Sequence, residues 1–159
     1  MWDNVKKYLG YAWASPVTAF GLIYVSLYTC MGWYKWYGKE GDALVWTVNN
    51  DKIPEWLTNY WKKLSGHASG QVVVLKNPPD SKAVTLRHEQ QHVSQTMCLG
   101  IFWPLFYYGI QIGIKLGCSE SHTYYDNPFE IDARRAAGQI IDIVGMTKKL
   151  VDSKKNESI

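Results

Sequence analysis

Residues 80–100 read Asp80-Ser-Lys-Ala-Val-Thr-Leu-Arg-His-Glu-Gln-Gln-His-Val-Ser-Gln-Thr-Met-Cys-Leu-Gly100. Asp80 or Ser81 is a good N-cap for a helix, and Gly100 is a good stop. The segment therefore predicts a helix that ends near Leu99. Within it, His88 and His92 are four residues apart, so their side chains project from one face about one turn from each other.

The spacing His88-Glu89-x-x-His92 is the HExxH pattern of a zinc site on a helix. Two imidazoles on one face can converge on one ion, and Glu89 can lie beside a water molecule at that ion and accept its proton. The alternative is the polar face of a surface helix. The apolar neighbours Leu86 and Val93 argue against this alternative, because unsatisfied histidines among them are costly.

A catalytic zinc site needs a third protein ligand and one open position. The segment from His122 to Arg134 holds nearly all the remaining candidates, and Glu130 lies in the first turn of the helix expected to start at Asn127. Asp126 and His122 are the reserve ligands. The competing interpretation of Glu130 is a capping box with Asn127, which requires no metal.

Nearby aromatic side chains offer a hydrogen-bond donor for a reaction at this site. Tyr124 or Tyr125 can stabilise an oxyanion, and we take Tyr125 as the catalytic candidate beside Glu89. Ordinary packing is the alternative for both rings. His67 lies between glycines in an expected loop, where a solvated side chain competes with a substrate contact.

Asp126 and Asp132 are candidates to orient a ligand histidine by accepting its second ring N–H. Each aspartate could instead pair with Arg134 or Arg135 on the surface of the last helix. The sequence leaves these two possibilities open.

The rest of the chain predicts an α+β fold that is mainly helical, with a small β-sheet. Residues 71–75 read as a strand that is either a sheet edge, to which an extended peptide can add, or a buried strand. The last helix is expected to continue to about Val151. The other expected elements are a strand at 43–48, a helix from Pro54 to before Gly66, and an apolar helix at 101–114.

Residues 8–34 carry no charge and are flanked by Trp and Tyr, as in a helix at a membrane. A buried helix of a soluble domain is the alternative. We therefore expect a membrane-associated N-terminal helix in residues 1–40, a metal-binding domain in 41–152 and a polar tail in 153–159. The expected location is the membrane, either single-pass or monotopic.

Composition limits the remaining functional classes. The chain has 159 residues, which suits one hydrophobic core, and its 14% aromatic content excludes intrinsic disorder. A net charge of +3 is too small and too scattered for a nucleic-acid groove, so no nucleic-acid partner is expected. Its three cysteines are widely separated and predict neither a disulfide framework nor a thiolate zinc site.

Three separated motifs resemble a largely uncharacterised family of small bacterial and phage proteins predicted to be metal-dependent peptidases. They are Ser15-Pro-x-Thr-x-x-Gly21, His88-Glu-x-x-His-x-x-Gln95 and Tyr125-Asp-Asn-Pro-Phe-Glu-x-x-Ala133. HExxH followed by a helical glutamate also resembles the gluzincin group of zinc metallopeptidases. The resemblance implies a minimal zincin-like domain, with His88, His92 and Glu130 as ligands and Glu89 as general base. It implies no substrate, and the chain lacks the separate substrate-binding domain of larger gluzincins.

The sequence thus predicts a zinc-dependent hydrolase, a membrane-associated metallopeptidase with one zinc ion. Its expected partners are a peptide or protein substrate and membrane lipid. The alternative is a non-catalytic membrane or virion structural protein that zinc stabilises, and a soluble binding module is a third possibility. A fourth protein ligand would favour the structural role, whereas an open position beside Glu89 would favour the enzyme.

Overall fold

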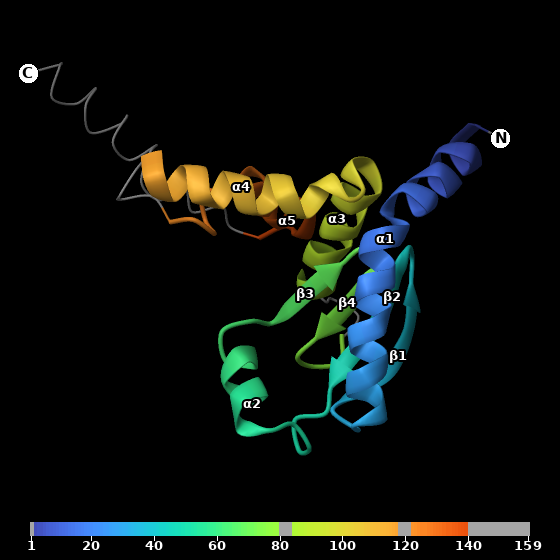
Figure 1. Ribbon diagram of the computed structural model, residues 1–159, viewed down its shortest axis with the longest axis vertical. Coiled ribbons are helices and arrows are strands. Elements are labelled where there is room, and N and C mark those ends of the chain that lie inside the picture. The colour runs from blue at the N-terminus through green and yellow to red at the C-terminus, as the bar shows by residue number, and fades with distance from the viewer. Residues whose placement is uncertain (1, 80–83, 118–121, 140–159) are drawn as a thin grey trace, which may run out of the picture.

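The computed structural model describes residues 2–79, 84–117 and 122–139. Within these residues the fold is α+β, with five helices and a four-stranded mixed sheet (Figure 1). The elements in chain order are α1 (Trp2–Cys30), β1 (Tyr34–Glu40), β2 (Ala43–Val48), α2 (Glu55–Trp61), β3 (Gly66–Ser69), β4 (Val72–Leu75), α3 (Val84–Leu99), α4 (Phe102–Gly117) and α5 (Pro128–Ala137). The expected fold class is confirmed at this level.

The strands lie in the order β1-β2-β4-β3. β1 and β2 form an antiparallel pair, and β3 and β4 form a second one. The two pairs join through the parallel strands β2 and β4, with Leu44 opposite Val72 and Thr47 opposite Leu75. β4 is therefore an inner strand, and β3 occupies the edge of the sheet.

Both faces of the sheet are covered, because alternate residues of a strand point to opposite faces. Val72 and Val74 of β4 pack in one cluster with Val25 of α1 and Leu57 of α2. Val73 and Leu75 pack in the other cluster, which includes Val93 of α3. One face of the sheet is thus covered by α2 and part of α1, and the other by α3 (Figure 1). The N-terminal part of α1 also contacts α3, because a Cβ at Gly10 would lie 3.1 Å from Met97.

α1 docks closely onto the turn between β3 and β4. The hydroxyl of Thr18 donates to the carbonyl of Ala14 and accepts the backbone N–H of Gln71 at 3.1 Å. At Gly21 the backbones come so close that an added Cβ would lie 2.7 Å from the carbonyl oxygen of Ser69. Two positions of the first sequence motif therefore fix how α1 lies on the sheet.

The two C-terminal helices, α4 and α5, pack against α3. α3 ends at Leu99, and the chain turns by 112° into α4 through Gly100, whose φ is +58°. α5 packs against α3, and its N-cap is Asn127, whose side chain accepts the N–H of Phe129 at 3.0 Å. α5 ends at Ala137, where Gly138 adopts the left-handed conformation.

Several sequence predictions need correction. Residues 34–40 form strand β1 and do not belong to the N-terminal helix, which ends at Cys30. Residues 72–75 are a fully buried inner strand, and the unpredicted β3 takes the edge. α5 ends at Ala137 with Gly138 as its C-cap, and residues 140–151 of the predicted last helix lie outside the described residues. The expected N-cap at Asp80 or Ser81 and the tail at 153–159 lie outside the described residues.

In the part of the chain that the structure describes, no single helix has the length and hydropathy needed to cross a bilayer. α3 and α4 meet that requirement only when they are taken together as a bent pair. The expectation of a membrane-associated helix in residues 1–40 stays a prediction.

The close approach at Gly21 makes a testable prediction. Gly21→Ala should lower the free energy of unfolding by about 1–3 kcal/mol, because the methyl group would overlap the Ser69 carbonyl and Val72. Thermal and urea unfolding followed by circular dichroism would measure the loss.

Gly109→Ala is the matched control, since a Cβ at Gly109 in α4 meets no atom within 4 Å. Both substitutions gain the same helix propensity, of about 1 kcal/mol. Equal stability changes for the two variants would contradict the packing argument at Gly21.

Candidate metal centre

The two histidines of the HExxH motif come together on α3. His88 and His92 are both buried, with 7% and 5% of their surface exposed, and their Nε2 atoms lie 3.2 Å apart. The helix therefore brings the imidazoles to one point, as the four-residue spacing predicted.

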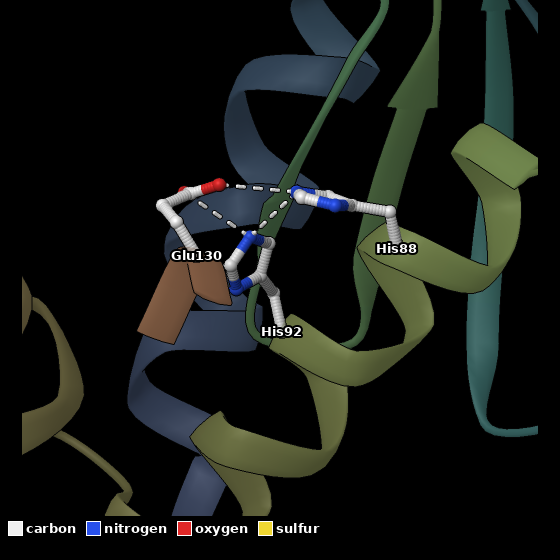
Figure 2. Close-up of side chains that lie close together, drawn as sticks. All are labelled: His88, His92 and Glu130. Carbon is white, nitrogen blue, oxygen red and sulfur yellow. Dashed lines mark hydrogen bonds and ion pairs between the residues drawn. The ribbon is translucent and has the colours of Figure 1, made fainter. Parts of the chain in front are cut away.

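Glu130 of α5 completes the group. Its carboxylate is 2% exposed, with Oε2 at 3.2 Å from His88 Nε2 and Oε1 at 3.3 Å from His92 Nε2. Figure 2 shows the three side chains pointing toward one another from the two helices. The carboxylate is thus directed away from the helix end, and the backbone N–H of Asn127 donates to Tyr124 instead. This geometry removes the capping box as the account of Glu130.

A chain of side chains fixes the orientation of His92. The Gln95 amide donates to the carbonyl of Phe129 and to Asp132, at 3.0 and 2.9 Å, so its oxygen must face the other way. That oxygen lies 2.8 Å from His92 Nδ1. Nδ1 therefore carries a proton, and neutral His92 presents the lone pair of Nε2 to the centre.

His88 is held in the same way from the end of α5. Its Nδ1 lies 3.0 Å from the side-chain oxygen of Gln139, which leaves Nε2 to face Glu130. When both imidazoles are neutral, their Nε2 lone pairs and the Glu130 carboxylate converge. The Oε2 atom of Glu130 is buried and has no hydrogen-bond partner. A proton or a metal ion between these atoms would offset the concentrated negative charge.

The spacing of the ligand groups is compatible with zinc. Ligand atoms about 2.0–2.1 Å from a tetrahedral zinc ion lie about 3.3–3.4 Å from each other. The two Nε2 atoms lie 3.2 Å apart, and the Glu130 carboxylate approaches His88 with Oε2 at 3.2 Å and His92 with Oε1 at 3.3 Å. Among the described residues, this group is the one in which three possible ligand atoms lie close together. His88, His92 and Glu130 can therefore hold a metal ion, although the geometry does not identify the element.

The closeness of these groups also shifts the pKa values of Glu130 and His92. Burial alone would raise the pKa of Glu130, but hydrogen bonds with His88 and His92 bring it well below the ordinary range. Burial lowers the pKa of His92, but the Glu130 carboxylate reverses this and leaves it raised. A proton on His92 can thus stand in for the cation, with a single charge where a metal ion would supply two.

Glu89 lies beside this group with 5% of its surface exposed. Burial raises the pKa of its carboxyl to about 7, and the nearby histidines oppose the rise. The side chain lies against β3, where a Cβ at Gly66 would come within 2.9 Å of Oε1. Glycine at position 66 therefore makes room for a carboxyl group whose pKa suits a general base near neutral pH.

A cavity of about 490 Å³ opens in front of the three ligands and Glu89. Its walls come from α1, α2, β3 and α4, and they include Phe20, Tyr60, Ser69 and Trp103. All three ligand residues and Glu89 line this cavity. The centre is thus reachable by a small molecule or a segment of peptide.

The tyrosines occupy different places around the centre. Tyr124 lines the cavity, and burial and the nearby Glu130 raise the pKa of its hydroxyl. Tyr107, which sequence reasoning did not single out, donates to Glu130 Oε1 at 2.6 Å. Tyr125 is 41% exposed, is not among the residues that line the cavity, and packs against Arg134. The structure does not bring Tyr125 to the ligands.

The other predicted site residues have different contacts from those expected. Asp132 accepts hydrogen bonds from Gln91 and Gln95, so it orients His92 through Gln95. Asp126 accepts the backbone N–H of His122, and neither of these reserve residues belongs to the ligand group. His67 lies in β3 and lines the cavity, in contrast to the solvated loop position expected for it.

Sequence reasoning assigned no role to three supporting residues. Gln95 ends the second sequence motif, three residues after His92, and this spacing on a helix was a usable signal. Tyr107 and Gln139 come from α4 and from the end of α5. No local pattern links them to His88 or Glu130, because the packing of separate helices brings them together.

No protein-family model, curated protein or solved structure matches this chain. The resemblance to gluzincins and to small phage and bacterial peptidases therefore stays a prediction. The geometry of the ligand group is independent of that resemblance.

The three-ligand geometry predicts the metal content of purified protein. We expect about one zinc ion per chain, and a loss of most of this zinc in His92→Ala and Glu130→Ala, since two ligands hold the ion weakly. Elemental mass spectrometry after dialysis would measure both.

His122→Ala is the control, because His122 is a histidine outside the ligand group. Its zinc content should equal that of the wild type. Full zinc occupancy in Glu130→Ala would contradict the assignment of the third ligand.

Proposed function

We propose that this protein is a zinc-dependent hydrolase on a zincin-like domain, and that it cleaves peptide bonds. The observation that carries the proposal is the convergence of the His88 and His92 Nε2 atoms and the Glu130 carboxylate, at separations of 3.2–3.3 Å, on a cavity that Glu89 also lines. Three protein ligands and an open fourth side are the arrangement of catalytic zinc. The three motifs described above support the same reaction.

The protein side chains divide the work of hydrolysis. A zinc ion held by His88, His92 and Glu130 would supply Lewis-acid chemistry, which polarises a carbonyl and makes water a stronger acid. Glu89 takes the proton of the attacking water and delivers it to the leaving amine, a double role that suits a pKa of about 7. Tyr124 lines the cavity near Glu130 and is the better placed of the two candidate tyrosines to donate to an oxyanion.

A non-catalytic zinc site that fastens α5 to α3 is the alternative. That role calls for a fourth protein ligand, which closes the coordination sphere. His122 and Asp126 were the candidates, and within the described ranges neither joins the ligand group. The buried general base and the open cavity are also without purpose in a structural site, so we favour the enzyme.

Glu89→Gln tests the proposed reaction. This variant should keep its zinc, because Glu89 is not among the ligands, and should lose activity by a factor of about 10² or more. Activity would be measured as new amino groups released from a pool of unstructured peptides, with zinc content measured in parallel.

Glu40→Gln is the control, since Glu40 is an exposed glutamate of β1. Equal rates for Glu89→Gln and the wild type would contradict the base assignment. The absence of metal-dependent cleavage by the wild type, across pools of varied sequence, would overturn the peptidase proposal.

We also propose a monotopic contact with membrane lipid. α4 leaves most of its apolar side chains uncovered, among them Leu105, Ile112 and Leu116, of which 67%, 58% and 82% are exposed. α1 exposes a further apolar row that includes Phe20 and Ile23. Large uncovered apolar surfaces on helices favour a bilayer interface, and the single charged side chain of α4, Lys115, lies in its last turn.

The membrane contact predicts lipid binding that depends on α4. Leu105→Ser combined with Ile112→Ser should weaken binding to vesicles of phosphatidylcholine and phosphatidylglycerol by about tenfold or more, because both side chains would leave the lipid. Co-sedimentation with vesicles would measure the partition.

The paired control is Trp36→Ser combined with Tyr37→Ser, which removes exposed apolar side chains from β1. This control should bind as the wild type does. Equal weakening in both double variants would argue against a specific α4 surface, and an absence of wild-type binding would overturn the membrane proposal.

A further inference from the structure

A second, smaller hollow of about 260 Å³ adjoins the cavity of the metal centre. The two share Phe20, Tyr24, Tyr60 and His67, so they are continuous. We call the smaller one the aromatic pocket. Its lining is Phe20, Tyr24, Tyr28, Tyr34, Trp56, Leu57, Tyr60 and His67.

Several polar groups of the aromatic pocket are already engaged in hydrogen bonds. The Tyr24 hydroxyl lies 2.5 Å from His67 Nε2, and the Tyr34 hydroxyl accepts the indole N–H of Trp61 at 3.3 Å. Tyr60 approaches the other nitrogen of His67 at 3.4 Å. Most of the remaining wall is ring surface, with the Tyr28 hydroxyl and the Trp56 indole N–H free to meet a ligand.

The aromatic pocket also carries no charge. Its lining contains no Asp, Glu, Lys or Arg side chain. Burial lowers the pKa of His67 to about 4, so this imidazole is neutral at physiological pH. A neutral, aromatic surface favours a large apolar guest, since a buried cation would lack a carboxylate partner.

β3 places the aromatic pocket next to the reacting groups. Gly66 touches the Glu89 carboxyl, and the following residue, His67, lies in the pocket wall. A side chain seated in the pocket therefore belongs to a residue close to the bond that Glu89 serves. This adjacency separates the aromatic pocket from the exposed apolar surface of α4.

We propose that the aromatic pocket selects peptide substrates by binding a large aromatic side chain, such as that of Phe, close to the cleaved bond. This inference rests on the proposed peptidase function, because it names the class of substrate for the same site. Phe20, Trp56 and Tyr60 are its specificity-determining residues, and their rings are the part of the wall open to an entering side chain.

Binding can be tested without hydrolysis by using zinc-loaded Glu89→Gln. Three capped tripeptides, Ala-Phe-Ala, Ala-Lys-Ala and Ala-Ala-Ala, would be titrated in turn and followed by amide NMR. We expect Ala-Phe-Ala to bind about tenfold or more tightly than Ala-Ala-Ala, as burial of an aromatic side chain implies.

A second substitution tests whether the preference for Phe arises in the aromatic pocket. Trp56→Ala in the same background should reduce it by about threefold or more, because the variant removes one exposed wall of the pocket. Phe20→Ala should act in the same direction. Trp36→Ala is the matched control, since Trp36 is also an exposed tryptophan but lines neither cavity.

The outcomes distinguish a failure of the aromatic-pocket proposal from a failure of the peptidase proposal. Equal binding of all three tripeptides, tightest binding of Ala-Lys-Ala, or equal effects of Trp56→Ala and Trp36→Ala would each overturn the aromatic pocket. A preference for Phe without any zinc-dependent cleavage by the wild type would uphold the pocket and overturn the peptidase. Cleavage without preference for an aromatic residue would do the reverse.

Discussion

The buried Glu130 carboxylate is the constraint on which the rest of the site depends. It lies between two imidazoles whose outer nitrogens are already held by Gln95 and Gln139, so its own environment offers little positive charge. A carboxylate in that position is tolerable only with a proton or a metal ion between the ligand atoms. The packing of α5 on α3 and the Tyr107 hydrogen bond hold it there.

The N-terminal helix has two roles in this arrangement. One stripe of α1, which includes Ala14, Thr18 and Val25, is buried in the fold. The adjacent side chains Phe20 and Tyr24 form walls of both cavities. Residues expected to contact a membrane thus also form walls of the cavities, because a long helix presents different faces to the core, the cavity and solvent.

The parts of the structure predictable from sequence were those encoded locally. The spacing of His88 and His92 fixed the ligand face of a helix, and Asn127-Pro128 marked the start of the helix that carries Glu130. Strand β1 was not predicted because Lys and Gly interrupt its aromatic residues, and β3 was not predicted because it has only 4 residues, Gly and Ser among them. Pairing with β2 and β4 stabilises both strands. Likewise, the rings of the aromatic pocket come from segments far apart in the sequence, so no local sequence pattern predicts the pocket.

The order of the ligands along the chain, on either side of the bend at Gly100 and α4, affects folding as well as the site. α4 lies between the helix that supplies the two histidines and the helix that supplies Glu130. A metal ion bound by all three would therefore act as a reversible cross-link that closes a loop around α4, and would restrict the unfolded chain as a disulfide does. During synthesis this cross-link could form only after α5 had emerged, so the site would be completed last. Metal supply would then govern the lifetime of the folded chain as well as its chemistry.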